Sequence, residues 1–498
     1  MISSPARAQG SRTALILFAY FFALFAASTA LRPLFEPDEG RYTAGALQML
    51  ERGDWIHPYL NPEQPHFSKP PIVYWPVMLG IKFLGRHEWA VRLANVFSWA
   101  GVLLLLAALG RRTMPARALS PALVFASSLY PFLAFSFITP DILLAFWEAL
   151  AASAFLFARY RPGRRDPKFW LTIAFVALGL GFATKGPPSL LVWLAWLITA
   201  LVLRDSTARA QGLWVPGMLL ALLLAVGWYI VVVLQEHRLL AFFVRGELYQ
   251  RMFTTAHHRN PAFYTGLAMY GGILVAGFLP LSVPAVVAWW RTGRKGPGAA
   301  LRRIRQDEPW TLFFLVWLAL GLAVFCFTPS RLPLYILPLA MPAAWVLGAL
   351  IPEGWWSSKW LPRMLVVWGL LVLVGVGAVR HAKIPEDARA FANHVQQENL
   401  LPADEIVFVG KEPYYGLRFY SGLEVERCEL TDPVPLPGAP YETFEPVMKE
   451  CADDPETRIW AVKTGHVEEL KRLLEESGCR VMEASRPYQG YHLLKTTP

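Results

Sequence analysis

The sequence predicts a polytopic α-helical membrane protein with a C-terminal soluble α/β domain. Three observations support this class. Hydrophobic residues make up 55% and charged residues only 17% of the 498 residues. The mean hydropathy is +0.35, and long apolar runs recur along most of the chain. Because an average soluble protein carries roughly 25% charged residues, the composition excludes a disordered chain and argues against a purely soluble one.

Charge divides the chain into two parts. Residues 385–498 hold 21 acidic and 12 basic residues, whereas the preceding 384 residues hold 16 acidic and 35 basic ones. In the first part the basic residues stand between apolar runs, so the positive-inside rule explains them better than nucleic-acid binding does. We therefore predict a membrane domain over residues 1–384, a soluble domain over residues 385–498, and no nucleic-acid partner.

The first apolar run, Thr13–Leu34, is long enough to span a bilayer. Arg7 and Arg12 precede it, as basic residues also precede the core of a cleaved signal peptide. The run is longer than a typical signal core, and no small-residue cleavage site is obvious before Glu36. We expect an uncleaved span that starts in the cytoplasm.

With ten further apolar runs, we expect eleven membrane spans. Long or divided runs could contain two more spans, which gives a range of 11 to 13. The runs lie near 89–110, 118–138, 142–160, 168–184, 187–203, 213–234, 263–290, 309–328, 332–350 and 363–380.

The segment Pro70–Gly85 is apolar but only about 16 residues long, too short for an ordinary span. Lys69 and Arg86 flank it, which favours a helix in the membrane interface. On this interpretation, five basic clusters all fall in cytoplasmic loops. The first loop, about residues 35–88, and the tail then lie together on the opposite side.

The tail reads as a small α/β domain. Strands are expected at Glu405–Gly410, Ile459–Lys463, Arg480–Ala484 and Tyr491–Lys495, and a helix at Val467–Ser477. Cys428, Cys451 and Cys479 allow at most one disulfide there, and their pairing stays open. Cys326 is the fourth cysteine of the chain, and the spacing of the four is not that of zinc ligands.

Acidic and basic residues gather in the segments that this topology places outside. Three carboxylates, Glu36, Asp38 and Glu39, crowd within four residues beside Arg41 and Tyr42. Such a group needs water, a cation or a basic partner. A solvated loop is the plainer interpretation, and a general base or cation site is the functional one.

Single charged residues mark three other places. Lys69, in a proline-stiffened turn, could bind a phosphate or simply reach the interface. Asp141 opens an apolar run, where it is either a functional carboxylate or a helix N-cap. Arg259 and Arg331 are basic residues on the side where the rule predicts few, and an anionic lipid head would explain them.

Seven motifs in order resemble those of one family. They are PDEGRY (37–42), GDW (53–55), KPP with YW (69–75), Asp141, TKGP (184–187), ELYQRMFTTAHHR (247–259) and SRLPLYILP (330–338). Together they resemble the bacterial GT-C membrane glycosyltransferases similar to 4-amino-4-deoxy-L-arabinose (aminoarabinose) transferase, which are related to the protein O-mannosyltransferases. The likeness covers roughly residues 13–350, and a periplasmic α/β domain after the last span also fits.

The resemblance implies transfer of a sugar from a polyprenyl-phosphate donor to a lipid, glycan or protein acceptor, with inversion and without a nucleotide. The enzyme would lie in the bacterial inner membrane with its site and tail facing the periplasm. Aminoarabinose transfer to lipid A is one version. The resemblance implies functional positions at Asp38, Arg41, Tyr42, Lys69 and Asp141, with Arg259 near the phosphate. Together with the charge pattern, it leads us to expect Asp38, Asp141 and Lys69 in catalysis, and Glu39, Arg41, Tyr42, Arg259 and Arg331 in substrate binding.

A divalent metal ion is a weaker implication. The family binds it with a glutamate before the lysine, the second-loop aspartate and a loop histidine, which correspond here to Ser68, Asp141 and His257. Ser68 is a poor metal ligand, and Gly40 stands where threonine is commoner in that subgroup. Two alternatives remain: a transporter or flippase of an anionic polyprenyl lipid, which should carry charges deep in its spans, and a non-catalytic relative.

Overall fold

The computed structural model describes the chain apart from residues 1–3, 161–165, 251–253, 255–259, 261, 294–301, 303, 357, 382–383, 385, 437–438, 440, 454–455 and 498. It forms two compact units. The membrane unit consists of Met1–Thr29, Ala94–Val231 and Val244–Ala378. The loop–tail unit consists of Ala30–Leu93, Val232–Phe243 and Val379–Pro498. The first loop therefore groups with the tail, although the charge pattern assigned it to the membrane domain.

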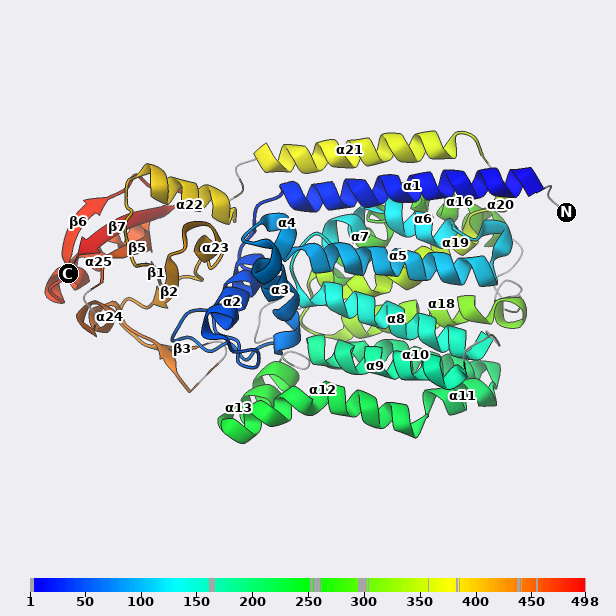
Figure 1. The fold of residues 1–498 in the computed structure, drawn as a ribbon, viewed down its shortest axis with the longest axis horizontal. Coiled ribbons are helices and arrows are strands. Elements are labelled where there is room, and N and C mark those ends of the chain that lie inside the picture. Colours follow the sequence, from blue (N-terminus) through cyan, green and yellow to red (C-terminus); the bar gives the residue numbers. More distant parts are fainter. Residues whose placement is uncertain are drawn as a thin grey trace. The chain divides into compact units, whose positions relative to one another are not determined.

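All regular secondary structure among the described residues of the membrane unit is helical. Long helices such as α1, α5, α8, α9 and α18 run in roughly one common direction (Figure 1). The helices are α1 (Ser4–Leu31), α5 (Leu93–Thr113), α6 (Ser120–Ser127), α7 (Leu129–Ala134), α8 (Pro140–Tyr160), α9 (Pro167–Lys185), α10 (Leu191–Leu203), α11 (Ser206–Gly212), α12 (Val215–Gln235), α15 (Phe263–Ala276), α16 (Ser282–Gly293), α18 (Pro309–Phe327), α19 (Ala340–Leu350), α20 (Glu353–Trp356) and α21 (Leu361–His381). Shorter turns are the 3-10 segments η2 (Pro115–Arg117), η3 (Pro187–Leu190) and η5 (Pro333–Leu339), and the π-helix η4 (Phe242–Gln250).

Each of the eleven apolar runs coincides with one or two of these helices. Among the described residues, seven helical segments are long and apolar enough to cross a membrane, and four shorter apolar helices accompany them. The predicted architecture is therefore confirmed: the chain is a multi-pass α-helical membrane protein with a C-terminal α/β domain.

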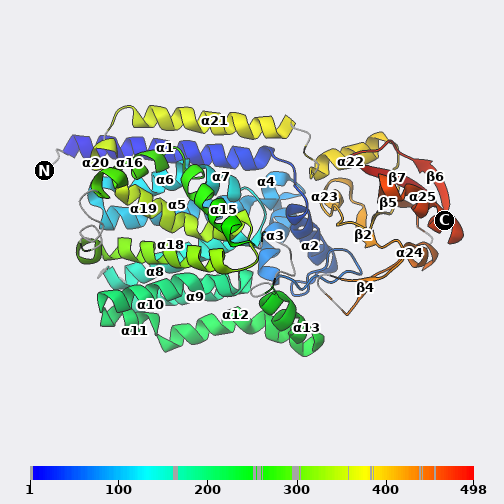
Figure 2. The same ribbon diagram turned by 180° about the vertical axis from the view of Figure 1, so that it is seen from behind.

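Two of the apolar runs are broken helices, and their breaks meet. Run 118–138 divides into α6 and α7 at Ser128, and run 263–290 divides into α15 and α16 after Gly277, as Figure 2 shows from behind. The backbone N–H of Tyr130 donates to the carbonyl of Gly277 at 2.7 Å. A Cβ on Gly277 would lie 2.6 Å from the Cβ of Tyr130, so only glycine permits this approach. Each break thus helps to satisfy polar backbone groups that lipid could not.

The loop–tail unit contains a mixed five-stranded sheet with strand order β2-β1-β5-β7-β6. Strand β1 pairs in parallel with β2 and β5, and β7 pairs antiparallel with β5 and β6. The strands are β1 (Glu405–Val409), β2 (Glu424–Cys428), β5 (Arg458–Lys463), β6 (Arg480–Ala484) and β7 (Tyr491–Thr497), with the short hairpin β3 (Val434–Pro435) and β4 (Thr443–Phe444). All five residues of β1 are buried, as expected for a central strand covered on both faces.

The helices of this unit come from both the first loop and the tail. The first loop contributes α2 (Asp38–Arg52), η1 (Pro71–Val73), α3 (Trp75–Leu84) and α4 (Glu88–Val91), followed later in the chain by α13 (Arg238–Ala241). The tail contributes α22 (Ala388–Gln397), α23 (Leu417–Ser421), α24 (Val447–Asp453), η6 (Thr464–His466) and α25 (Val467–Glu476). The expected tail strands and helix are confirmed. The pattern missed β2, the hairpin, α23 and α24, which are short or only partly apolar.

Loop and tail share one apolar core. Ala44 of α2 and Leu60 of the first loop are buried in the same cluster as Phe391, Ile406 and Phe408 of the tail. Helix α3 has only 10 residues, about 15 Å at 1.5 Å per residue, so it cannot cross a bilayer. A disulfide joins Cys451 to Cys479, while Cys428 is a buried free thiol.

Candidate active site

Glu39 is the anchor of the acidic segment. Its side chain is 1% exposed, and Arg32 and Arg92 bond to it at 2.8 and 2.9 Å. The backbone N–H of Phe35 also donates to it at 3.0 Å. Burial by itself would raise the pKa of Glu39, but the two guanidinium groups outweigh it and lower this pKa to about 2. The structure thus gives Glu39 a role in fixing the start of α2, and contact with a substrate stays a prediction.

Asp38 and Arg41 lie one turn apart on α2, with different surroundings. Asp38 is exposed at the first position of the helix. Arg41 is 22% exposed and forms an ion pair with Glu412 of the tail. Burial disfavours the Arg41 cation, but the charges of Glu412 and Asp38 outweigh this effect and raise the pKa of Arg41. Asp38 is therefore a carboxylate accessible to solvent, and the guanidinium of the nearby Arg41 is paired with Glu412 instead of with Asp38.

Tyr42 and Lys69 occupy the inner side of the first loop. Tyr42 is 5% exposed, and its ring packs against Tyr74 with centroids 5.5 Å apart. Lys69 is half-buried and donates to the carbonyl of Ser68 at 2.6 Å. The Ser68 hydroxyl lies 2.6 Å from Nε2 of His66. The motifs PDEGRY and KPP with YW are thus brought together.

Asp141 lies in the membrane unit, in the first turn of α8, and is 5% exposed. It forms an ion pair with Lys185, the last residue of α9. The Lys185 ammonium also lies 4.3 Å from the ring centroid of Tyr335. Helix α8 begins at Pro140, so Asp141 stands within the helix rather than at its cap. Lys185 was not among the predicted site residues, although it lies in the TKGP motif.

Arg331 is 2% exposed, and its guanidinium joins two segments of the membrane unit. It donates to the carbonyls of Asn260 at 2.8 Å, Ala262 at 3.0 Å and Cys326 at 2.7 Å. These bonds hold the segment before α15 against the end of α18. The structure gives Arg331 this bracing role, and its contact with phosphate stays a prediction.

His257 and Arg259 lie outside the described residues, so their predicted roles stay open. The remaining expected metal positions fit a metal poorly. Lys185 already supplies a cation beside Asp141, and Ser68 is engaged with His66.

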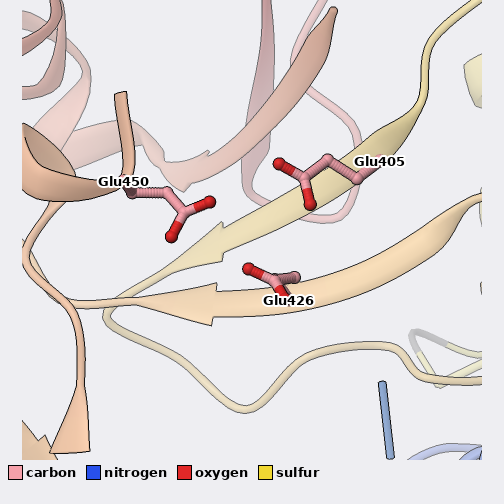
Figure 3. A group of neighbouring side chains, drawn as sticks. All are labelled: Glu405, Glu426 and Glu450. Atoms are coloured by element: carbon pink, nitrogen blue, oxygen red, sulfur yellow. The ribbon is translucent and has the colours of Figure 1, made fainter. Parts of the chain in front are cut away.

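One group of carboxylates elsewhere has metal-like spacing. Among the described residues, ligand atoms of Glu405, Glu426 and Glu450 lie within 4.8 Å of one another, converging from β1, β2 and α24 (Figure 3). Arg458 forms an ion pair with Glu405 and approaches Glu450 at 3.3 Å. Burial and the neighbouring carboxylates outweigh Arg458 and raise the pKa of Glu405 to about 7. Arg458 thus already acts as the cation of this cluster.

One further carboxylate is buried in the described part of the membrane unit. Glu148 of α8 is 2% exposed, and neither of its oxygens makes a hydrogen bond of ordinary geometry with another described residue. The neighbouring polar groups are Lys185 and Trp317. The sequence analysis missed this residue because a single glutamate does not interrupt an apolar run.

Comparisons with known proteins agree on one group. A profile of the dolichyl-phosphate-mannose-protein mannosyltransferase family matches residues 10–242. An undecaprenyl phosphate-alpha-4-amino-4-deoxy-L-arabinose arabinosyl transferase of Pseudomonas fluorescens is 30% identical over 367 residues, which are 72% of this chain and 62% of that protein. The enzyme of the same name from Sodalis glossinidius is 33% identical over 352 residues, 68% and 59% of the two chains. The chain therefore spans about three fifths of the length of these relatives.

A solved structure has the same fold. It is the crystal structure of ArnT from Cupriavidus metallidurans bound to undecaprenyl phosphate, with a TM-score of 0.77 over 97% of both chains at 18% identity. The apo form of the same protein gives a TM-score of 0.75. The likeness drawn from the seven motifs is therefore confirmed.

Proposed function

We propose, from the similarity to the aminoarabinose transferases and protein mannosyltransferases, that the chain is a membrane glycosyltransferase of the GT-C type. It transfers a sugar from a polyprenyl-phosphate donor to an acceptor at the periplasmic face of the bacterial inner membrane. The observation that carries this proposal is the curated relatives' shared name, which describes an undecaprenyl-phosphate-linked sugar. The buried ion pair of Asp141 and Lys185 supports it, because a lysine at the end of a span can bind an anionic head.

The reaction is a direct displacement with inversion. The acceptor oxygen forms a bond to the anomeric carbon as the bond from that carbon to the phosphate oxygen breaks. Asp38 accepts the acceptor's proton when the acceptor is a hydroxyl. The electron pair stays on the departing polyprenyl phosphate, and Lys69, Lys185 and Arg259 stabilise its growing negative charge. An acceptor that is already a phosphate needs no base, and Asp38 then orients it.

The acceptor is a lipid in this proposal, and lipid A with aminoarabinose as the sugar is its most specific form. The names of the relatives support the sugar and its lipid-linked donor but name no acceptor, whereas the matching family profile names a protein as acceptor. Offering a lipid extract and a protein extract in parallel decides between these acceptors.

The test is a transfer assay on the purified full chain. The protein is incubated with a panel of polyprenyl-phosphate sugars and a membrane extract, and mass spectrometry follows donor loss and new products, with Asp38→Asn in parallel. We expect donor consumption that vanishes in Asp38→Asn. A protein that binds polyprenyl phosphate but consumes no donor would instead be a lipid transporter or an inactive relative.

A metal requirement is tested in the same assay. A chelator, followed by added divalent cations, should leave the rate of transfer unchanged, because Lys185 already supplies the positive charge beside Asp141. Loss of activity that Mn²⁺ or Zn²⁺ restores would show that Asp141 and His257 hold a metal after all.

A further inference from the structure

One segment of the tail reaches the catalytic segment of the first loop. It is the connection between β1 and α23, residues 410–416, called here the clamp loop. The backbone N–H of Gly416 donates to the Glu36 carboxylate at 2.6 Å, and the Tyr415 hydroxyl donates to Gln64 at 2.8 Å. Glu412 pairs with Arg41. Three of its residues therefore contact the first loop directly.

Two glycines make room for this contact. The Glu36 carboxylate is buried, and its Oε2 would lie 2.2 Å from a Cβ placed on Gly40. A Cβ on Gly416 would lie 2.6 Å from Oε1 of the same carboxylate. Neither position can take a larger residue without moving Glu36. The close approach of the Glu36 carboxylate thus requires glycine at position 40 of the PDEGRY motif.

The position of Glu412 bears on Asp38. Arg41 follows Asp38 by three residues on α2, a spacing at which opposite charges on a helix attract each other. Without another partner, the Arg41 guanidinium would be drawn to the Asp38 carboxylate and would cover it. Glu412 competes for the same guanidinium from the tail. The result is an exposed Asp38 beside an arginine that is held elsewhere.

The Arg41–Glu412 pair is a poor candidate for a purely stabilising contact. Glu412 is 49% exposed, and ion pairs of such exposure contribute little to stability because water screens them. The buried contacts of the clamp loop at Glu36 and Gln64 already join tail and loop. The exposed Arg41–Glu412 pair therefore affects the direction of the Arg41 side chain more than it stabilises the contact between the tail and the first loop.

We propose that Glu412 is a positioning residue of the transfer reaction, through which the tail holds Arg41 away from Asp38 and keeps that carboxylate available to the acceptor. This rests on the proposed function, in which Asp38 receives the acceptor's proton. It also assigns a task to the tail: the tail completes the catalytic segment of the first loop.

The first test measures transfer kinetics of Glu412→Gln in the full chain. The kcat should fall about 10-fold to 100-fold, the cost of a small misplacement of a reacting group, while the donor KM and the melting temperature stay near those of the wild type. Glu412→Asp keeps the charge and should retain most of the activity. The matched control is Glu445→Gln, which removes the carboxylate of the exposed Lys449–Glu445 pair of the tail and should change nothing.

The second test does not depend on turnover. A water-soluble carbodiimide with an amine modifies exposed carboxyl groups, and peptide mass spectrometry gives the rate at Asp38. In Glu412→Gln this rate should fall several-fold, because Arg41 then covers Asp38. An unchanged labelling rate overturns the proposal, as does an equal loss of activity and melting temperature in Glu412→Gln and Glu412→Asp. A wild type that transfers no sugar contradicts the proposed function and with it a catalytic task for Glu412, whereas the labelling result alone decides whether Glu412 holds Arg41 away from Asp38.

Discussion

At the scale of single residues, Asp38 and Glu39 are adjacent carboxylates of the acidic segment with different roles. Glu39 is buried between two arginines, whereas Asp38 faces solvent one residue before it. Glu39 was predicted to bind substrate because the sequence does not show which of two adjacent carboxylates is buried. Burial and partners make one an anchor and leave the other accessible for chemistry.

The anchoring role of Glu39 predicts a pH-dependent stability. Its pKa is about 2 in the folded protein, against 4.5 as the ordinary value. Because the folded pKa is depressed, the stabilisation is present above pH 4.5 and is lost as the pH falls from there toward 2. It amounts to about 3 kcal/mol at neutral pH, from 1.36 kcal/mol per pKa unit.

Thermal unfolding of the purified chain in detergent checks this prediction. Glu39→Gln should lower the melting temperature at pH 7 and should flatten its decline between pH 5 and pH 3. Glu468→Gln, at an exposed glutamate of the tail, is the control and should leave the decline as in the wild type. A Glu39→Gln protein with wild-type stability would mean that Arg32 and Arg92 do not depend on this carboxylate.

We expect Lys185 to contribute to catalysis, although its role was not predicted from the sequence. Lys185→Met leaves Asp141 buried without its cation and removes a charge that would stabilise the leaving phosphate. We expect kcat/KM for the donor to fall roughly 10²-fold to 10³-fold, as when one donor of an anion hole is lost. Lys168→Met, at the exposed start of the same helix α9, should keep the wild-type value and serves as the matched control.

At the scale of elements, helix packing depends on small residues at close crossings. Helices α6 and α19 meet where Gly348 approaches Pro121, and a Cβ on Gly348 would lie 2.8 Å from the Pro121 nitrogen. The hydroxyl of Ser120 donates to the Gly348 carbonyl at 3.2 Å. Small residues let helix backbones approach in this way where lipid offers no competing hydrophobic force.

Gly348→Val should therefore separate α6 from α19. We expect a loss of about 1–3 kcal/mol, typical of overpacking a tight contact, measured as a lower melting temperature in detergent. Gly375→Val, in helix α21, is a suitable control because no atom of the described residues lies within 4 Å of a Cβ at that position. Equal effects of the two substitutions would argue against a tight crossing.

At the scale of the whole molecule, membrane orientation is the main expectation still to be measured. The positive-inside rule places the basic loop at Arg204–Arg209 in the cytoplasm and the tail in the periplasm. The four native cysteines offer little background, because Cys326 and Cys428 are buried and Cys451 is paired with Cys479.

Labelling with a membrane-impermeant maleimide in spheroplasts tests this orientation. Glu468→Cys, in the tail, should react in intact spheroplasts. Thr207→Cys, in the loop with Arg204, should react only after permeabilisation. The reverse pattern would invert the topology and place the Asp38 segment in the cytoplasm.

The sequence by itself determined the class of the protein, the places of the spans and the strands of the tail. Hydropathy and charge act locally: a run of about 20 apolar residues must cross or leave the bilayer wherever it stands, and basic loops stay on one side. Asp38, Lys69 and Asp141 could be proposed as site residues because their motifs are continuous in the chain, and their roles stay predictions.

Only the tertiary structure decided the partners of these residues. Lys185 meets Asp141 across 44 residues of sequence, and Glu412 meets Arg41 across 371. No local sequence pattern indicates such ion pairs, because the partner of a charged side chain is set by which residues the fold places next to it. The same reason explains why Glu39 and Arg331 proved to be buried and bonded within the fold, and why the first loop joined the tail in one unit. Composition determines whether a segment lies in the membrane or in water, but tertiary packing determines which residues it contacts.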